Sequence, residues 1–366
     1  MVEHVPPRGG GAYEMLVINP GSTSTKVAVY AGEDELFREE MVHAQAEVGC
    51  RALAEQMPMR EAAVRGALEK RGYDPRRLDG VVGRGGLIPG LDMGGYRVNE
   101  AMCQVIRSGK LVSHASNLGA LLAEAVAAPL GIPAVIYDAA GADSMMDIAR
   151  ITGMPEIHRQ SFCHVLNSRA MGREYARSLG REYADLRLLV AHLGGGISIS
   201  AHLGGKIIDV VSDDGGPFSP ERAGSLPIHY IIDMCFDKGY TKEEVLCKQR
   251  GNGGLKALLG TSDCREVERR IAAGDEYAAL CYRAQAYQIA KGIGNLAPAL
   301  SCRMDAILLT GGLAHSELLT GMVKDYVALL APVVVMPGEN EMRALALGLL
   351  RILRGQERAQ EYQPKK

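Results

Sequence analysis

Two distant stretches of the sequence share one pattern: an apolar run, a turn of small residues, a second run and a glycine. They are MLVINPGSTSTKVAVYAGE (residues 15–33) and LRLLVAHLGGGISISAHLGGKIIDV (residues 186–210). A shift of 173 positions aligns Asn19 with His192, Gly21 with Gly194, Ala28 with Ala201 and Gly32 with Gly205. Any two β-hairpins share part of this pattern, but these turns are longer than the usual two-residue turn and lack Asn-Gly and Asp-Gly. We therefore predict a duplicated unit.

The length of the chain favours the same two-part organisation. It has 366 residues, and single hydrophobic cores usually stop growing beyond about 250–300 residues. We predict a flexible leader at 1–13, an N-terminal domain of residues 14–150 plus 343–366, and a C-terminal domain of residues 151–342. The last segment is expected to return to the first domain because EMRALALGLLRILRG (341–355) has an apolar helical face that must pack.

Strands and helices alternate in the first half of the chain. LDGVVGRGG (78–86) is typical of a buried strand that runs into a glycine turn, and NLGALLAEAVAAPLG (117–131) is typical of an apolar helix. IPAVIYDAAG (132–141) then predicts another strand, with Asp138 at its carboxyl end. This alternation indicates an α/β layered fold.

Composition excludes several classes of function. A formal net charge of −2 and the absence of Trp argue against nucleic acid as a partner. The eight cysteines form no CxxC pair, which argues against a structural zinc site. No apolar run is long enough to cross a membrane and no signal-peptide pattern is present, so we expect a cytoplasmic protein with no membrane partner.

Three small-residue turns have the composition of phosphate-binding loops. NPGSTSTK (19–26) supplies a glycine, hydroxyl groups and a lysine, and HLGGGISIS (192–200) supplies three glycines after a buried strand. LLTGG (308–312) is a third such turn. Each turn alone is also compatible with an ordinary hairpin tip. Their matched positions favour two loops that hold a polyphosphate, with the third next to a nucleoside.

VINPGSTSTK and VAHLGGGISISAHLGG resemble the two signature stretches of the acetate and butyrate kinase family, in the superfamily of actin, hexokinase and the heat-shock chaperones. The resemblance extends from about residue 15 to 355. GRGG (83–86), PFSPERAG (217–224) and Gly195, where acetate kinases usually have Asn, are closer to the butyrate kinases. The resemblance implies an α/β fold of two similar, duplicated domains of the actin-like ATPase (ribonuclease H-like) type, with a cleft between them.

The resemblance also implies a reaction. ATP would transfer its γ-phosphoryl group to a short-chain carboxylate with Mg²⁺, which gives ADP and an acyl phosphate, and the protein would be a homo-oligomer of two or more chains. Butyrate is the first expectation, with acetate and propionate as alternatives. A carboxylic acid with a pKa near 4–5 is ionised at pH 7, so the nucleophile needs no strong general base. Cations must instead bring two anions together.

Four residues would have catalytic roles by this resemblance. Arg84 would orient the carboxylate, and Arg222 would stabilise the transferring phosphoryl group. Asp138 would position the nucleophile or the waters of Mg²⁺, and His192 would donate a hydrogen bond to phosphate. Without the resemblance, each has an ordinary alternative: a surface arginine, a helix-start arginine, a helix cap and a structural histidine.

Further residues are expected to bind the ligands. His114, Val82 and Ile88 would contact the acyl substrate together with Arg84, and Asn19 with Glu341 (or Glu339) would hold Mg²⁺. The residues expected to contact the nucleotide and its phosphates are Asn19, Ser22, Ser24, Lys26, Gly194, Gly195, Gly196, Gly311 and Gly312.

Other functions on such a sequence remain open. A sugar kinase of the same fold would use Asp138 as a general base, but a neutral sugar does not call for two arginines. A nucleotide-driven switch protein would need a partner-binding module, for which little of the chain is left. An acyl transferase without nucleotide would not explain the paired phosphate loops.

Overall fold

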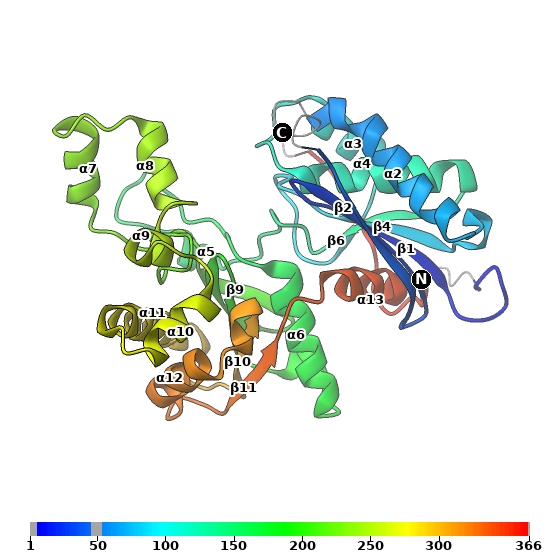
Figure 1. The fold of residues 1–366 in the computed structure, drawn as a ribbon. Helices are drawn as coiled ribbons and strands as arrows, with labels where there is room; N and C mark the ends of the chain where they lie inside the picture. The colour runs from blue at the N-terminus through cyan, green and yellow to red at the C-terminus, as the bar shows by residue number, and fades with distance from the viewer. Residues whose placement is uncertain (1–5, 45–52, 365–366) are drawn as a thin grey trace. The chain divides into compact units, whose positions relative to one another are not determined.

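The structure is a computed structural model that describes residues 6–44 and 53–364, and the chain divides into two compact units (Figure 1). Unit 1 consists of Met1–Asp143 and Asn340–Lys366, and unit 2 consists of Ser144–Glu339. The sequence had placed these boundaries slightly later in the chain, at residues 150 and 342. Each unit is built on one mixed β-sheet with helices on both faces.

The sheet of unit 1 has the strand order β12-β5-β6-β4-β1-β2-β3. β1 pairs antiparallel with β2 and parallel with β4, and β4 pairs parallel with β6. The described strands of this unit are β1 (Glu14–Pro20), β2 (Ser24–Ala31), β3 (Asp34–Val42), β4 (Gly80–Arg84), β5 (Gly95–Arg97), β6 (Ala134–Tyr137) and β12 (Gln360–Glu361).

Helices cover both faces of this sheet. Helices α2 (Met57–Lys70), α3 (Glu100–Arg107) and α4 (Leu118–Ala127) lie on one face, and α13 (Glu341–Leu353) lies on the other (Figure 1). Two glycines of β4, three positions apart, show the two faces: a Cβ on Gly83 would meet Gly119 of α4, and one on Gly80 would meet Leu349 of α13. The last segment of the chain therefore completes the first unit.

The sheet of unit 2 has the order β11-β10-β7-β8-β9. Its described strands are β7 (Leu188–Leu193), β8 (Ile197–Leu203), β9 (Lys206–Val211), β10 (Ala306–Gly311) and β11 (Val333–Pro337). The described α-helices are α5 (Asp147–Arg150), α6 (Val165–Ser178), α7 (Ile228–Phe236), α8 (Lys242–Gln249), α9 (Gly254–Leu259), α10 (Cys264–Ala272), α11 (Glu276–Leu296) and α12 (Glu317–Val327).

The strands of unit 2 alternate between two apolar cores, as the period of a strand requires. Leu188 and Val190 pack with Met171 of α6 on one face. Leu189 and Ala191 pack with the larger cluster on the other face, which includes residues of α11 and α12. β7 is therefore buried on both faces, which explains its continuous apolar run.

The two units repeat one strand arrangement. In each, the first strand pairs antiparallel with the second and parallel with the strand that follows a helical connection. Asn19 lies opposite Lys26 in unit 1, and His192 lies opposite Ser198 in unit 2. The second turn is thus one residue shorter, so the matching offset falls from 173 to 172 after it.

This corrected offset aligns two further irregularities. The bulge at Val29 falls on the bulge at Ala201, and Gly32, with φ 60°, falls on Gly204, with φ 59°. The sequence alignment had instead matched Ala28 with Ala201 and Gly32 with Gly205. The backbone therefore supports the duplication and moves its second strand by one residue.

The described part of the expected leader makes specific contacts. The backbone N–H of Arg8 donates to Asp79 Oδ1 at 2.7 Å, and its guanidinium donates to the carbonyl of Leu130 at 3.1 Å. Tyr13 is buried. Residues 8–13 thus differ from the flexible segment that the sequence suggested, while residues 1–5 lie outside the described part. Among the described residues, we find no helix whose length and apolar character would let it span a membrane.

A close backbone approach between β4 and α4 makes a stability prediction. A Cβ on Gly119 would lie 2.1 Å from the carbonyl oxygen of Arg84, so Gly119→Ala should lower the free energy of unfolding by about 3 kcal/mol. Gly66→Ala is the matched control, because a Cβ there meets no atom within 4 Å. Because Gly66 is at an exposed helix position, Gly66→Ala should raise the free energy of unfolding by about 0.5–1 kcal/mol. Urea unfolding of both variants measures this, and a Gly119→Ala protein as stable as the wild type would contradict the packing.

Candidate functional site

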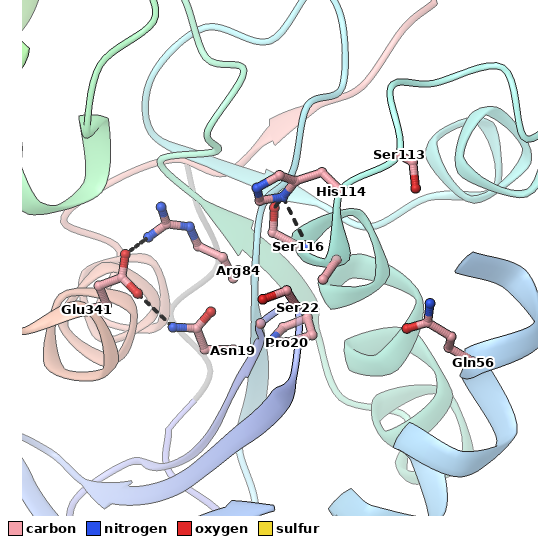
Figure 2. Close-up of a pocket in the computed structure, with 11 residues that line it drawn as sticks. Asn19, Pro20, Ser22, Gln56, Arg84, Ser113, His114, Ser116 and Glu341 are labelled. Atoms are coloured by element: carbon pink, nitrogen blue, oxygen red, sulfur yellow. Dashed lines mark hydrogen bonds and ion pairs between the residues drawn. The ribbon is translucent and has the colours of Figure 1, made fainter. Parts of the chain in front are cut away.

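Unit 1 contains a cavity of about 460 Å³ where the turn after β1 meets the end of β4. Side chains from five separate segments of the chain point toward it (Figure 2). Its lining is mostly polar and consists of Asn19, Pro20, Gly21, Ser22, Gln56, Arg84, Ser113, His114, Ala115, Ser116 and Glu341. Hydroxyl, amide and guanidinium groups in this arrangement suit an anionic ligand.

Glu341 connects two of the predicted site residues. Its Oε1 accepts a hydrogen bond from Arg84 Nη1 at 2.7 Å, and its Oε2 accepts one from Asn19 Nδ2 at 2.8 Å (Figure 2). The Arg84 side chain is only 13% exposed. Asn19 and Arg84 come together because β1 and β4 are parallel neighbours, and Glu341 joins them as the first residue of α13. The guanidinium of Arg84 thus already binds a carboxylate in this cavity.

His114 also lines the cavity, at the start of a short 3-10 helix (Ala115–Asn117). Its Nδ1 contacts the hydroxyl of Ser116 and caps the backbone N–H of that residue (Figure 2). Burial and the positive charge of Arg84 lower the pKa of His114. The neutral imidazole is therefore the favoured form at pH 7.

Ser24 and Lys26, which the sequence predicted at the phosphates, face elsewhere. Ser24 Oγ donates to Glu40 Oε1 at 2.9 Å, and Lys26 Nζ lies 3.9 Å from the same oxygen. Both residues belong to β2 and point toward its antiparallel neighbour β3. Of the polar side chains predicted in this turn, Asn19 and Ser22 line the cavity, and Ser24 and Lys26 do not.

Val82 and Ile88, the predicted acyl contacts, also lie outside the lining of this cavity. Both are fully buried in the core of unit 1. Val82 is a central residue of β4, between β1 and β6. The apolar surface next to Arg84 is therefore smaller than the sequence suggested.

Asp138 follows β6 and is 2% exposed, with a positive φ of 42°. Its Oδ1 accepts the backbone N–H of Gly94 at 2.8 Å, and its own N–H donates to the Gly94 carbonyl at 3.0 Å. These bonds hold the start of β5 and do not place the carboxylate in the cavity lining. Asp138 therefore supports the start of β5 and does not line the cavity of unit 1.

In unit 2, His192 is the second-last residue of the buried strand β7 and is 1% exposed. Its ring stacks on that of His164, with centroids 3.8 Å apart and planes at 11°. Its Nδ1 lies 3.1 Å from Asn167 Nδ2, and its Nε2 lies 3.0 Å from Glu339 Oε1. Glu339, the alternative to Glu341 as a metal ligand, thus lies in unit 2 beside this histidine.

The contacts of Thr310 determine which nitrogen of His192 carries the proton. Thr310 Oγ1 donates to the carbonyl of Gly338 at 3.3 Å, so it faces Asn167 as an acceptor. The atom of Asn167 that lies 3.2 Å from it must therefore be the Nδ2 amide group. The same group faces His192 Nδ1 as a donor, which leaves Nδ1 unprotonated and places the proton of the neutral ring on Nε2.

The three glycines after β7 leave room for Arg222. A Cβ on Gly196 would lie 2.5 Å from the guanidinium carbon of Arg222. Ser219 Oγ donates to the carbonyl of Gly195 at 2.5 Å, and the backbone N–H of Arg222 donates to Ser219 Oγ at 3.1 Å. The segment that carries Arg222 is therefore attached to this loop.

Neighbouring charges and burial both affect the guanidinium of Arg222. Its guanidinium pairs with Asp213, which also pairs with Arg250 at 3.0 Å. Burial, assisted by the charge of Arg250, lowers the pKa of Arg222 to about 10. Arg222 stays charged at pH 7, since this value is still well above neutrality.

Gly311 and Gly312, predicted beside the adenosine, differ in their surroundings. Gly311 ends β10 with φ 90°, and a Cβ there would lie 2.4 Å from the carbonyl oxygen of Leu193. A Cβ on Gly312 would meet no atom within 4 Å. Gly311 thus permits β10 to approach the loop after β7. The backbone at Gly312 has open space beside it instead.

Sequence reasoning missed Asn167 and Gln56, and it gave no role to His164. His164 and Asn167 are three positions apart at the start of α6, a spacing that places two side chains on one helix face. That spacing, together with the neighbouring His192 signature, is the signal that identifies them. Gln56 precedes α2 and has no such signal in the sequence.

Solved structures with the same arrangement define the class of this protein. The acetate kinase of Porphyromonas gingivalis matches with a TM-score of 0.75 at 19% identity, over 93% of this chain and 100% of that chain. The acetate kinase of Entamoeba histolytica matches with a TM-score of 0.73 at 16% identity, over 92% and 98%. The fold is the two-domain α/β fold of these kinases, which confirms the predicted fold class.

Sequence comparisons identify the family. The model of the acetokinase family matches residues 156–329. Butyrate kinase 2 of Clostridium acetobutylicum is 42% identical over 353 residues, which cover 96% of this chain and 99% of that protein. A probable butyrate kinase of Clostridium botulinum is 42% identical over 96% of this chain and all of that protein. The chain belongs to the acetate and butyrate kinase family, and it is a carboxylate phosphotransferase that uses ATP.

The assigned proton position of His192 can be measured directly. Ring-¹⁵N histidine labelling should show His192 with a protonated Nε2 and a bare Nδ1, assigned by difference from His192→Gln. Asn167→Asp should move the proton to Nδ1 and favour the charged ring, because a carboxylate there only accepts hydrogen bonds. Thr310→Ser keeps the hydroxyl and serves as the control with an unchanged spectrum. A protonated Nδ1 in the neutral ring of the wild type would disprove the assignment.

Proposed function

We propose that this protein phosphorylates butyrate with MgATP to give butyryl phosphate. The observation that carries the proposal is the Arg84 guanidinium, which faces a polar cavity and already binds the carboxylate of Glu341. Arginine binds carboxylates through its planar fork, so the same group suits a substrate carboxylate. The choice of butyrate follows the two butyrate kinases that match nearly the whole chain.

The proposed chemistry is a direct transfer. A carboxylate oxygen of the substrate forms a bond to the γ-phosphorus of ATP, and the bond from that phosphorus to the ADP oxygen breaks. No proton has to leave, since the acid is ionised at pH 7. This agrees with Asp138, the base that a sugar kinase would need, which is buried and bonded to Gly94.

Residues of each unit are assigned to one part of the reaction. Arg84 and His114 of unit 1 contact the acyl substrate, and Asn19 with Ser22 contacts the phosphoryl group. In unit 2, His192 Nε2 and Arg222 contact phosphate oxygens. His192 suits this role because its buried Nε2 faces the carboxylate of Glu339 at 3.0 Å, so it is placed to donate to an anionic oxygen. Gly312 is assigned to the nucleoside.

The donor atoms fit a magnesium ion that the substrate helps to hold. The described residues contain no group of three or more acidic, histidine or cysteine side chains arranged for a metal. Glu341, with the amide oxygen of Asn19 beside it, offers the oxygen donors that Mg²⁺ prefers, and phosphates with water complete such sites. When bound, the ion would neutralise charge on the phosphates.

The proposal predicts the outcome of a hydroxylamine trap for acyl phosphates. With MgATP and equal amounts of acetate, propionate, butyrate, isobutyrate and valerates, butyrate should give the highest kcat/KM. Each methylene contributes about 1–3 kcal/mol of discrimination, so propionate should follow within about tenfold to a hundredfold. Chelation of Mg²⁺ should abolish the product. A higher kcat/KM for acetate would overturn the assignment of butyrate.

Removal of Arg84 tests the carboxylate site. Arg84→Ala should raise the KM for butyrate about tenfold to a hundredfold, because a charged hydrogen bond contributes about 1.5–3 kcal/mol. The KM for ATP should change less than about threefold. Arg343→Ala is the control, since Arg343 lies on the same helix as Glu341 but pairs with Glu33 at 3.2 Å. Equal shifts for butyrate and ATP would remove Arg84 from the carboxylate site.

A further inference from the structure

Arg60 is a buried arginine directly beneath the turn that follows β1. It lies in the first half of α2 and is 0% exposed. Its Nη2 donates to the carbonyl of Gly21 at 2.9 Å and, more weakly, to that of Ser22 at 3.5 Å. Its Nη1 donates to the carbonyl of Ser24 at 3.1 Å. One guanidinium therefore donates hydrogen bonds to three carbonyl groups of one short turn.

The remaining donors of Arg60 are satisfied by two side chains. Nε and Nη2 donate to Gln56 Oε1 at 3.2 and 3.0 Å, and Nη1 donates to Thr25 Oγ1 at 2.9 Å. Gln56 itself lines the cavity (Figure 2). The guanidinium is thus fixed from three sides: by Gln56 just before α2, by the turn and by Thr25 of β2.

These bonds set the direction of the turn's N–H groups. In a trans peptide the carbonyl and the following N–H point in opposite directions. The Gly21 and Ser22 carbonyls face Arg60, so the N–H groups of Ser22 and Thr23 point away from it. Within the described residues neither of these two N–H groups has a hydrogen-bond partner. Successive free N–H groups in a turn form an anion-binding concavity.

The charge of Arg60 is not neutralised nearby. In the part of the chain that the structure describes, no carboxylate lies within ion-pair distance of it, and Gln56 is neutral. Burial alone lowers the pKa of Arg60, yet an arginine retains its charge in proteins. A buried cation without a counter-ion is costly, and an anion bound on the other side of the turn reduces this cost.

We propose that Arg60 is the positioning residue of the phosphoryl-binding turn. It holds the carbonyls of Gly21, Ser22 and Ser24 inward, which presents the N–H groups of Ser22 and Thr23 to the phosphoryl group, and its charge favours an anion there. Arg60 contacts no ligand itself. This inference rests on the proposed function, in which the turn binds the phosphoryl group.

The test measures the reverse reaction, from butyryl phosphate and ADP to ATP, together with thermal unfolding. Arg60→Met should raise the KM for butyryl phosphate about tenfold to a hundredfold, because it removes both the fork and the charge. Arg60→Lys should raise it less, since an ammonium keeps the charge but cannot reach three carbonyls. The KM for butyrate in the forward direction should stay within about twofold in both variants.

Arg351→Met is the control for the loss of a partly buried, hydrogen-bonded arginine. Arg351 of α13 donates to the Tyr137 hydroxyl at 2.8 Å and to Glu357 at 3.1 Å, away from the cavity lining. The Arg351→Met substitution should lower the midpoint of thermal unfolding and leave the KM for butyryl phosphate unchanged. If Arg351→Met raises this KM as much as Arg60→Met does, the positioning role is overturned.

The remaining outcomes separate this inference from the proposed function. An active wild type with an unchanged KM for butyryl phosphate in Arg60→Met overturns the inference alone. If Arg60→Met does not fold, Arg60→Lys decides, and an unchanged KM there overturns the role of the fork. A wild type that makes no butyryl phosphate overturns the proposed function instead.

Discussion

The parallel pairing of β1 with β4 is the constraint on which the site of unit 1 depends. Ile18 lies opposite Gly83 in this register, so the next residues, Asn19 and Arg84, emerge at the same edge of the sheet. β4 can pair with β1 and still pack closely against α4, because Gly83 and Gly119 have no side chains where the strand and the helix meet. Everything else in the cavity is added to this edge: α13 brings Glu341, and the segment before α4 brings His114.

The same construction recurs in unit 2 with different chemistry. His192 and Thr310 are paired residues at the ends of the parallel strands β7 and β10, where unit 1 has Asn19 and Arg84. α6 packs on these strands as α13 packs on β1 and β4, and it contributes Asn167 where α13 contributes Glu341. Unit 1 therefore presents an ion pair at this position, and unit 2 presents hydrogen bonds among Thr310, Asn167 and His192. The duplicated backbone is retained, while the side chains at the strand ends have diverged to separate tasks.

Much of this arrangement follows from the sequence, and the exceptions have physical reasons. Apolar runs and small-residue turns predict the two hairpins, and a polar residue after a buried strand predicts Arg84 and His192. Ser24 and Lys26 were assigned to phosphate because of their residue types, but strand pairing turns them toward Glu40. The contacts of Asp138 and of Arg60 depend on Gly94 and on the turn after β1, which the chain order does not place beside them. Arg60 in particular resembles its exposed neighbours in α2, because a helix pattern rich in Ala, Glu and Arg does not reveal which arginine is buried.

The charges of the unit 1 cavity agree with an acceptor that is already an anion. Glu341 is the one acidic residue of its lining, and Arg84 and Asn19 occupy both of its oxygens. Arg84 within this lining and Arg60 beneath it supply positive charge. A carboxylate nucleophile gives up no proton and needs only cations that offset its repulsion from phosphate.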